Sequence, residues 1–374
     1  MEFFKIIGIG LSESCRYMWR GTFDTYSFWQ RCMRVNVIYA KFFQAIAVHY
    51  DFSEDIHSIP YTEDELLYPK DIPVTGIIGT GLISIVFEGE IDGVPIVIKT
   101  KRKDIERRVC STLTTLDKWI RRLNCLCSCP LLLKAYTDIC ENFKTQLDFK
   151  SEFDNHVLFI ELYQDLKYLK VPKLYPELCN EDQIVMTKLT GIPINTLTEE
   201  EKIQTIKWLA QIIVHGTMKH GFTHSDLHVG NIIFNKDSIG IIDFGFVLRF
   251  NELDKNIFYN LLKEFAMDNL EEAAYYTMLL TEPEEARDNL SVDDIKDITN
   301  FIIHIYKKAT SVDMFFSIYD ILQINKKLGT YNMGISPTFY KGVVGLTSIE
   351  GVLNHLSSTT SDFVICAITE FMDT

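Results

Sequence analysis

Helical periodicity marks the first part of the chain. Apolar side chains recur every three or four positions over residues 28–50, which predicts a helix. Lys41 and Gln44 are three residues apart and so share one face of it. Residues 51–75 are acidic and contain Pro60, Pro69 and Pro73, a composition typical of a connector.

The pattern then changes to the two-residue period of strands. Residues 83–91 and 94–99 predict two strands, and Asp92-Gly93 between them is a strong hairpin signal. Residues 104–170 are mostly helical in pattern, and a further strand pair is predicted around 174–175 and 184–187. From residue 198 onward helices dominate, interrupted by short strands at 232–234 and 239–242.

A strand-rich part followed by a helix-rich part predicts an α+β chain with two lobes around a cleft. We therefore expect an N-terminal helical extension over residues 1–75, a strand-rich N-lobe over 76–190 and a helical C-lobe over 191–374.

Composition narrows the function classes. The 374 residues include 37 Lys and Arg against 51 Asp and Glu, a net charge of −14, which argues against a nucleic-acid-coating protein. No run of consecutive apolar residues reaches the ~18 that a membrane-spanning helix needs. The nine cysteines show neither disulfide-framework nor zinc spacing, which favours a reducing compartment. With no signal or transit peptide recognised, we expect an intracellular, cytoplasmic protein.

Positive charge is concentrated in residues 99–122, which hold nine basic and three acidic side chains. Such a run could meet anionic lipid head groups or phosphates, so a lipid or an anionic membrane surface is one candidate partner. A solvated helix face is the simpler interpretation of the same residues.

The most specific chemical signal is the sequence His-Ser-Asp-Leu-His-Val-Gly-Asn, which ends at Asn231 and is followed by Asp-Phe-Gly from Asp243. Phosphoryl transfer needs a carboxylate near the acceptor oxygen and oxygen ligands that hold Mg²⁺ on the phosphates. Asp226 is therefore the candidate base, and Asn231 and Asp243 are the candidate metal ligands. We expect His224 and His228 to brace backbone rather than bind metal.

A glycine pair, Gly79 and Gly81, precedes the first predicted strand and would complete a nucleotide site. Two glycines allow backbone amides to approach phosphates closely, and Lys99 at the end of the predicted hairpin would contact the α- and β-phosphates. Glu152 is the candidate carboxylate that holds Lys99, and the adenine would lie against backbone around 186–189. The predicted nucleotide contacts are Gly79, Thr80, Gly81, Ser84, Lys99, Met186, Leu189, Asn231 and Asp243.

With these residues in place, the chain resembles the UbiB/ADCK group of atypical kinases, also called AarF-domain proteins. Residues 41–44 look like its Lys-x-Gly-Gln signature, and 146–148 with Glu152 resemble its Glu-x-Asp motif and helix glutamate. Residues 224–231 resemble its His-x-Asp-Pro-His-Pro-Gly-Asn loop. The resemblance covers roughly residues 30–358.

The resemblance implies a two-lobed protein-kinase-like fold with an extra N-terminal helical layer that packs over the cleft. It implies ATP and Mg²⁺ as cofactors and a link to isoprenoid-lipid metabolism of the ubiquinone type. Lys41, Gln44 and Asp148 are then expected to be regulatory. Phe43 replaces the signature glycine and Gln146 the first acid of Glu-x-Asp, so a peptide-blocking role of this layer is weakened here.

Three hypotheses stay open at this point. The first is an enzyme that binds Mg-ATP and hydrolyses it or transfers its γ-phosphate. The second is a small-molecule kinase of the choline or aminoglycoside kinase type, whose loop reads His-x-Asp-x-His-x-x-Asn. The third is a nucleotide-gated scaffold, a pseudokinase with little turnover, in which the same residues bind nucleotide only.

Overall fold

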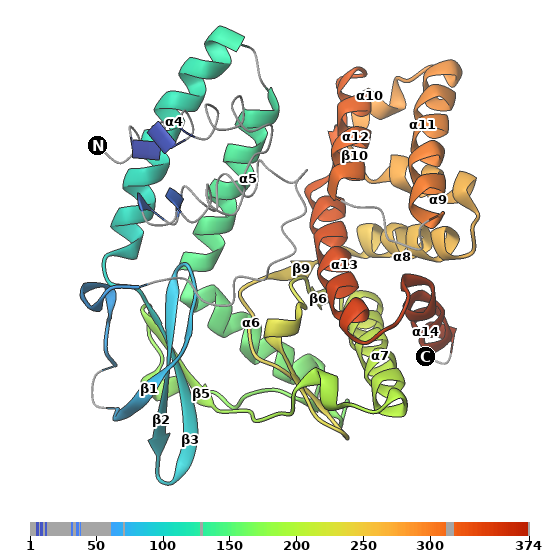
Figure 1. Ribbon diagram of the computed structural model, residues 1–374. Coiled ribbons are helices and arrows are strands. Elements are labelled where there is room, and N and C mark those ends of the chain that lie inside the picture. The colour runs from blue at the N-terminus through green and yellow to red at the C-terminus, as the bar shows by residue number, and fades with distance from the viewer. Residues whose placement is uncertain are drawn as a thin grey trace. The chain divides into compact units, whose positions relative to one another are not determined.

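The computed structural model describes residues 61–69, 72–127, 130–311 and 318–372, with isolated positions before residue 40 (Figure 1). The chain forms two compact units, the first made of Met1–Ser151 and Leu174–Lys188, the second of Glu152–Lys173 and Leu189–Thr374. Both helices and strands are present, which confirms the predicted α+β class. The predicted helix around Lys41 and Gln44 lies outside the described residues.

The first unit is built on an antiparallel sheet with strand order β1-β2-β3-β5. Ile85, Phe87, Ile96 and Ile98 alternate along the two central strands, so all four are buried on one face. Asp92 and Gly93 adopt positive φ angles of 50° and 79°, as a tight hairpin turn requires, and the predicted hairpin is confirmed. The strands are β1 Val74–Thr80, β2 Ser84–Ile91, β3 Val94–Lys101 and β5 Gln183–Thr187.

Helices follow the sheet in the chain. Helices α4 and α5 run side by side after β3 (Figure 1), and α6 begins in the first unit and continues into the second. Asp148 is the N-cap of α6, because its Oδ1 accepts a hydrogen bond from the Ser151 amide at 2.9 Å. The elements are η1 Glu63–Glu65, α4 Ile105–Cys127, α5 Pro130–Leu147, α6 Phe149–Leu162 and η2 Pro176–Leu178.

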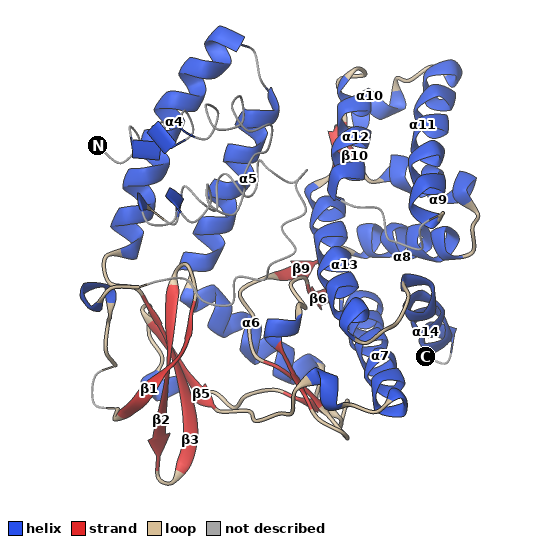
Figure 2. Ribbon diagram, in the orientation of Figure 1, coloured by secondary structure: helices blue, strands red, loops and turns tan. Residues whose placement is uncertain are grey.

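The second unit is mainly helical (Figure 2). Helix α7 starts with a capping box, in which Thr198 and Glu201 each accept the other's backbone amide. Helix α13 begins with Ser336 as N-cap and Pro337 in its first turn. The helices are η3 Ile194–Thr196, α7 Glu199–Val214, η4 His215–His220, η5 Val229–Asn231, α8 Glu252–Ala266, α9 Leu270–Leu279, α10 Glu284–Asp288, α11 Val292–Thr310, α12 Ile318–Gly329, α13 Pro337–His355 and α14 Thr360–Met372.

Short strands thread between these helices. They form a three-stranded sheet in the order β4-β8-β7 and two strand pairs, β6 with β9 and β10 with β11. One continuous apolar core runs through this unit from α6 to α14. No helix in the described ranges has the length and apolarity to cross a bilayer. The strands are β4 Leu169–Lys170, β6 Phe222–His224, β7 Ile232–Phe234, β8 Ile239–Ile241, β9 Val247–Arg249, β10 Thr281–Glu282 and β11 Gly334–Ile335.

Candidate functional site

Two loops of the second unit carry the residues singled out by the kinase-like motifs. Strands β7 and β8 pair antiparallel with Ile232 opposite Ile241, so Asn231 and Asp243 lie at the same end of this strand pair. Asp226 lies on the loop that leads from β6 into Asn231. The structure therefore brings these three predicted residues together although seventeen positions separate the first from the last.

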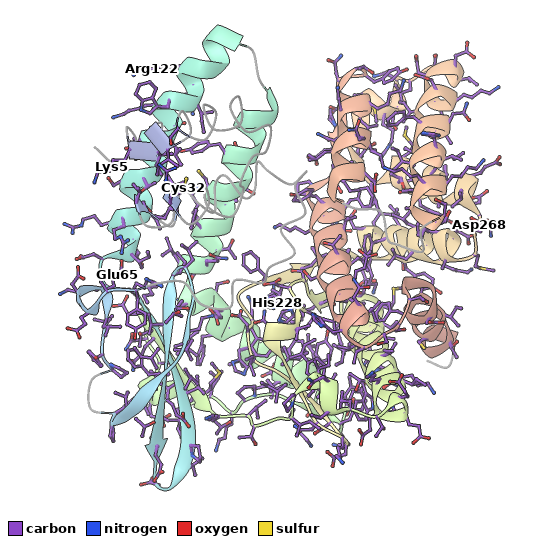
Figure 3. All side chains as sticks on the ribbon, in the orientation of Figure 1. Lys5, Cys32, Glu65, Arg122, His228 and Asp268 are labelled. Atoms are coloured by element: carbon purple, nitrogen blue, oxygen red, sulfur yellow. The ribbon has the colours of Figure 1, made fainter. Side chains whose placement is uncertain are left out.

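Hydrogen bonds fix the side chains of these loops. The Asn231 amide group donates from Nδ2 to the Asp226 carbonyl at 3.0 Å, which orients its Oδ1 acceptor away from that bond. The Asp243 carboxylate accepts the Gly245 amide through Oδ1 at 2.9 Å. The Asp226 side chain is 36% exposed, and its Oδ2 lies 3.7 Å from Nε2 of His228, which is labelled in Figure 3. Asp226 is thus within reach of a substrate.

His224 ties the two loops to each other. Its Nδ1 accepts the Asp226 amide at 3.1 Å, and its Nε2 donates to the Asp243 carbonyl. Only the neutral imidazole with its proton on Nε2 satisfies both bonds. Burial lowers the pKa of His224, which keeps this neutral form. His228 accepts the Gly230 amide through Nδ1 at 3.0 Å, so the predicted bracing role is confirmed for both histidines.

Helix α6 supports the Asp-Phe-Gly loop through residues that the sequence motifs do not mark. Asn155 donates to the Phe244 carbonyl at 3.1 Å and accepts from Arg249 at 3.0 Å. The His156 ring stacks on the Phe244 ring with their centroids 4.1 Å apart. Both residues follow Glu152 by three and four positions, and that spacing on one helix face is the signal that could have identified them.

Glu152 lies close to Asp243 at Gly245. A Cβ atom at position 245 would lie 3.2 Å from Asp243 Oδ1 and 3.6 Å from Glu152 Oε2. The glycine therefore leaves room for two carboxylates, of which Glu152 is only 6% exposed.

The residues present suit magnesium better than a transition metal. Within the described ranges, no group of three or more His, Cys, Asp or Glu side chains converges as a metal-binding cluster. Mg²⁺ prefers oxygen donors and is commonly held by one or two protein ligands together with waters and substrate phosphates. Asn231 and Asp243 offer such oxygens at one end of the β7–β8 pair, so the donor set fits the ion.

The predicted phosphate-binding segment lies in the first unit, but not entirely in a loop. Gly79 and Thr80 are the last residues of β1, which corrects the expectation that the glycine pair precedes the first strand. The turn between β1 and β2 is therefore limited to residues 81–83, and its Gly81 amide donates to the Ser84 carbonyl at 2.8 Å. Gly79 pairs with Val86 of β2, and Val86 pairs with Lys99 of β3. Gly79 and Lys99 therefore share one row of the sheet, two strand spacings or about 10 Å apart.

A buried arginine holds this turn. Arg102, only 2% exposed, donates from Nε and Nη2 to the Gly81 carbonyl at 3.0 and 2.8 Å. Its Nη1 pairs with Glu65, which also pairs with Arg108 in the first turns of α4. Glu65 is labelled in Figure 3. Burial lowers the pKa of Arg102, an effect that the Glu65 charge opposes. We name these contacts the Arg102 clamp.

Lys99 lies over an aromatic ring. Its Nζ is 5.6 Å from the centroid of Phe149, and Lys101 approaches the same ring at 5.5 Å. The Lys101 ammonium is also paired with Glu106 at 2.6 Å. Both lysines therefore point to the start of α6.

The other predicted contacts are distributed over both units. Met186 is buried in β5 of the first unit, opposite Val97 of β3. Leu189 belongs to the second unit, where its Cδ1 would be 2.8 Å from a Cβ atom at Gly240. Asp148 caps α6, which is a structural role for a residue predicted to be regulatory.

Comparison with known proteins identifies relatives. The profile of a family described as "ABC1 atypical kinase-like domain" matches residues 77–277. A "Probable protein kinase UbiB" of Pasteurella multocida is 28% identical over 182 residues, which cover 45% of this chain and 34% of that protein. A protein of the same name from Glaesserella parasuis is 32% identical over 180 residues, 44% of this chain and 32% of that protein. The matched part thus spans about a third of these curated relatives.

One solved structure also resembles the chain. It is titled "The complex structure of Rv3197-erythromycin from Mycobacterium tuberculosis" and is 17% identical in sequence. The superposition has a TM-score of 0.46 and covers 85% of this chain and 84% of the other.

Proposed function

Because this chain belongs to the ABC1 atypical kinase-like family, as the UbiB/ADCK resemblance predicted, we propose that it binds Mg-ATP and hydrolyses it or transfers its γ-phosphate. The observation that carries the proposal is the pair of braced loops in the second unit. Asp226, Asn231 and Asp243 meet there, and His224 connects the loops that carry them. A carboxylate beside two oxygen ligands is the arrangement that phosphoryl transfer requires.

Asn231 and Asp243 would hold Mg²⁺. When bound, the ion neutralises the charge that develops on the phosphate oxygens. The Asp243 carboxylate is held through Oδ1 by the Gly245 amide, and the Asn231 amide by the Asp226 carbonyl, so both would meet the ion in fixed orientations. Such preorganisation is a major source of catalysis in charge-stabilising sites.

Asp226 would act on the attacking group. Its carboxylate accepts the proton of an acceptor hydroxyl, or orients a water molecule for attack on the γ-phosphate. The side chain is 36% exposed, so an acceptor can approach it. The His224 bond to the Asp226 amide holds the backbone of this residue while the side chain acts.

Lys99 and the turn that ends at Ser84 would bind the phosphates, and Glu152 would hold the lysine. The shared sheet row of Gly79 and Lys99 supports a common ligand for the two. We propose that the adenine lies against the backbone around Met186 and Leu189.

We also propose that the activity serves isoprenoid-lipid metabolism, which the family resemblance implies. The acceptor in this proposal is water or a lipid-pathway component.

The test is magnesium-dependent ATP turnover by the full chain, with the γ-phosphate followed to its destination. Asp226→Asn keeps the shape of the side chain and removes its basicity, so we expect turnover to fall by about 10²–10⁴-fold. Asp293→Asn, at an exposed position in the first turn of α11, is the matched control and should leave the rate unchanged.

Other outcomes point elsewhere. Equal phosphate release by wild type and Asp226→Asn would refute the assigned role of this residue. Nucleotide binding with no turnover in either protein would favour the scaffold hypothesis. Label on a choline-like or aminoglycoside-like acceptor would favour the small-molecule kinase instead.

A further inference from the structure

An apolar cavity lies inside the second unit, next to the residues that precede Asp226. It has a volume of about 80 Å³ and is formed by α7, η4, β6, β9, α8, α13 and α14. Its wall consists mainly of aliphatic and aromatic side chains, including Leu262, Leu346, Ile349, Phe363 and Ala367. Cavities walled by aliphatic and aromatic side chains can bind small apolar groups.

The lining of the cavity also includes two basic side chains. Lys263 of α8 and Lys341 of α13 lie in its lining, and the cavity is partly open to solvent. Lys341 is exposed, and the side chain of Lys263 is 39% exposed. The Lys263 ammonium forms an ion pair with the Glu264 carboxylate at 3.8 Å. Two ammonium groups beside an apolar interior complement a ligand with an anionic head and an apolar tail.

The size of the cavity sets the length of the buried tail. An engineered cavity of about 150 Å³ binds benzene or xenon. A volume of about 80 Å³ is roughly half of that, so it accommodates the end of an alkyl chain rather than a ring system. The rest of the chain would pass through the opening toward the two lysines.

We propose that this cavity binds a medium-chain carboxylate, a free fatty acid whose head group lies between Lys263 and Lys341. The site does not depend on ATP chemistry. It is nevertheless adjacent to the reactive loop, because the residues before Asp226, His224 and Ser225, also line the cavity. The apolar tail of a bound carboxylate would therefore contact His224 and Ser225, the two residues that precede Asp226.

The test is isothermal titration of the full chain with octanoate, below its micelle concentration. We expect octanoate to bind more tightly than hexanoate, by up to about fifteenfold, which is the limit when both additional methylenes are buried at about fourfold each. The neutral octanol and the cationic octylamine should bind more weakly than octanoate. Both comparisons use unmodified protein, so they do not depend on a variant that folds.

Variants locate the site. Reversing both charges, Lys263→Glu with Lys341→Glu, should weaken octanoate binding by about tenfold, since each exposed pair contributes little alone. Lys296→Glu reverses an exposed charge in the same unit outside the cavity lining and should have no effect. Ala367→Leu adds carbon atoms in the cavity and should reduce binding further, with the folded state verified by circular dichroism.

The proposal is wrong if octanol or octylamine binds as tightly as octanoate, or if the double lysine variant and Lys296→Glu behave alike. Binding that survives Ala367→Leu unchanged would place the ligand elsewhere. None of these outcomes depends on ATP turnover, so they leave the proposed function untouched.

Discussion

Replacing Arg102 should destabilise the first unit through the turn that precedes β2. Arg102→Met keeps most of the apolar stem of the side chain and removes the guanidinium. The Gly81 carbonyl then loses the donors at 3.0 and 2.8 Å, and the buried Glu65 carboxylate loses one of its two arginine partners. Glu65 is 14% exposed and keeps Arg108, which is itself one-third exposed.

The expected magnitude follows from these contacts. Breaking a buried ion pair from one side costs about 3–5 kcal/mol, and an unsatisfied buried carbonyl about 1–3 kcal/mol. Because Glu65 retains Arg108, we expect a loss at the low end of the ion-pair range, about 3 kcal/mol from the free energy of unfolding. For a unit of this size that corresponds to a fall in Tm of roughly 6–12 °C. Arg102→Lys should rescue little, since a single ammonium cannot serve both partners.

Urea titration of the full chain measures this effect, and a double-mutant cycle with Glu65→Gln isolates the pair. The double variant should cost less than the sum of the single ones by about 0.5–3 kcal/mol, because both remove the same interaction. A loss below about 1 kcal/mol for Arg102→Met, with additive single effects, would refute the clamp. A loss of nucleotide affinity without loss of stability would place the role of Arg102 in binding alone.

Three further predictions concern the second unit. Gly245→Ala puts a Cβ atom 3.2 Å from Asp243 Oδ1, so the carboxylate must shift. Mg²⁺-dependent turnover should then fall by up to about 10²-fold, measured by Mg²⁺ titration of ATPase activity. Unchanged turnover would contradict this prediction. Asn155→Ala leaves the Phe244 carbonyl without its donor and should cost about 2 kcal/mol by urea titration, where a loss under 0.5 kcal/mol would be inconsistent with the contact. His224 has a lowered pKa in the folded protein, so below pH 6.5 the unfolded chain binds more protons than the folded one. The contribution of His224 to the free energy of unfolding should therefore be complete above that pH and fall as the pH drops below it. His224→Gln should flatten this dependence in urea titrations at pH 5.5–7.5, and an unchanged dependence would contradict the assignment.

Local signals were sufficient for part of the fold. The β2–β3 hairpin follows from alternating apolar residues around Asp92-Gly93, because the turn chemistry and the strand period lie within twenty residues. The short strands β7 and β8 were predicted from apolar runs, and they determine where Asn231 and Asp243 meet. The motif spacing therefore predicted this part of the candidate site together with its supporting strands.

Other features depend on partners distant in the chain. Strand β1 was not predicted, because Gly76 and Gly79 interrupt its Val, Thr and Ile residues, and its pairing with β2 shifts register at both glycines. The predicted strand at 174–175 is reduced to one bridge between Leu174 and Met186. Arg102 lies 37 residues from Glu65, and Asn155 lies 89 residues from Phe244, separations over which periodicity carries no information.

The packing of α13 against the loop that carries Asp226 limits how this protein can be divided. A Cβ atom at Gly345 would lie 3.3 Å from the Ser225 Cα, so the backbone of α13 touches the residue directly before Asp226. The stretch that matches the family ends at residue 277, sixty residues before α13 begins. A fragment cut at that boundary would lack the helix that packs against the Asp226 loop and would expose apolar core residues to water. The segment that carries Asp226, Asn231 and Asp243 therefore depends on α13, and any chimera that exchanges this segment between relatives must include the C-terminal helices.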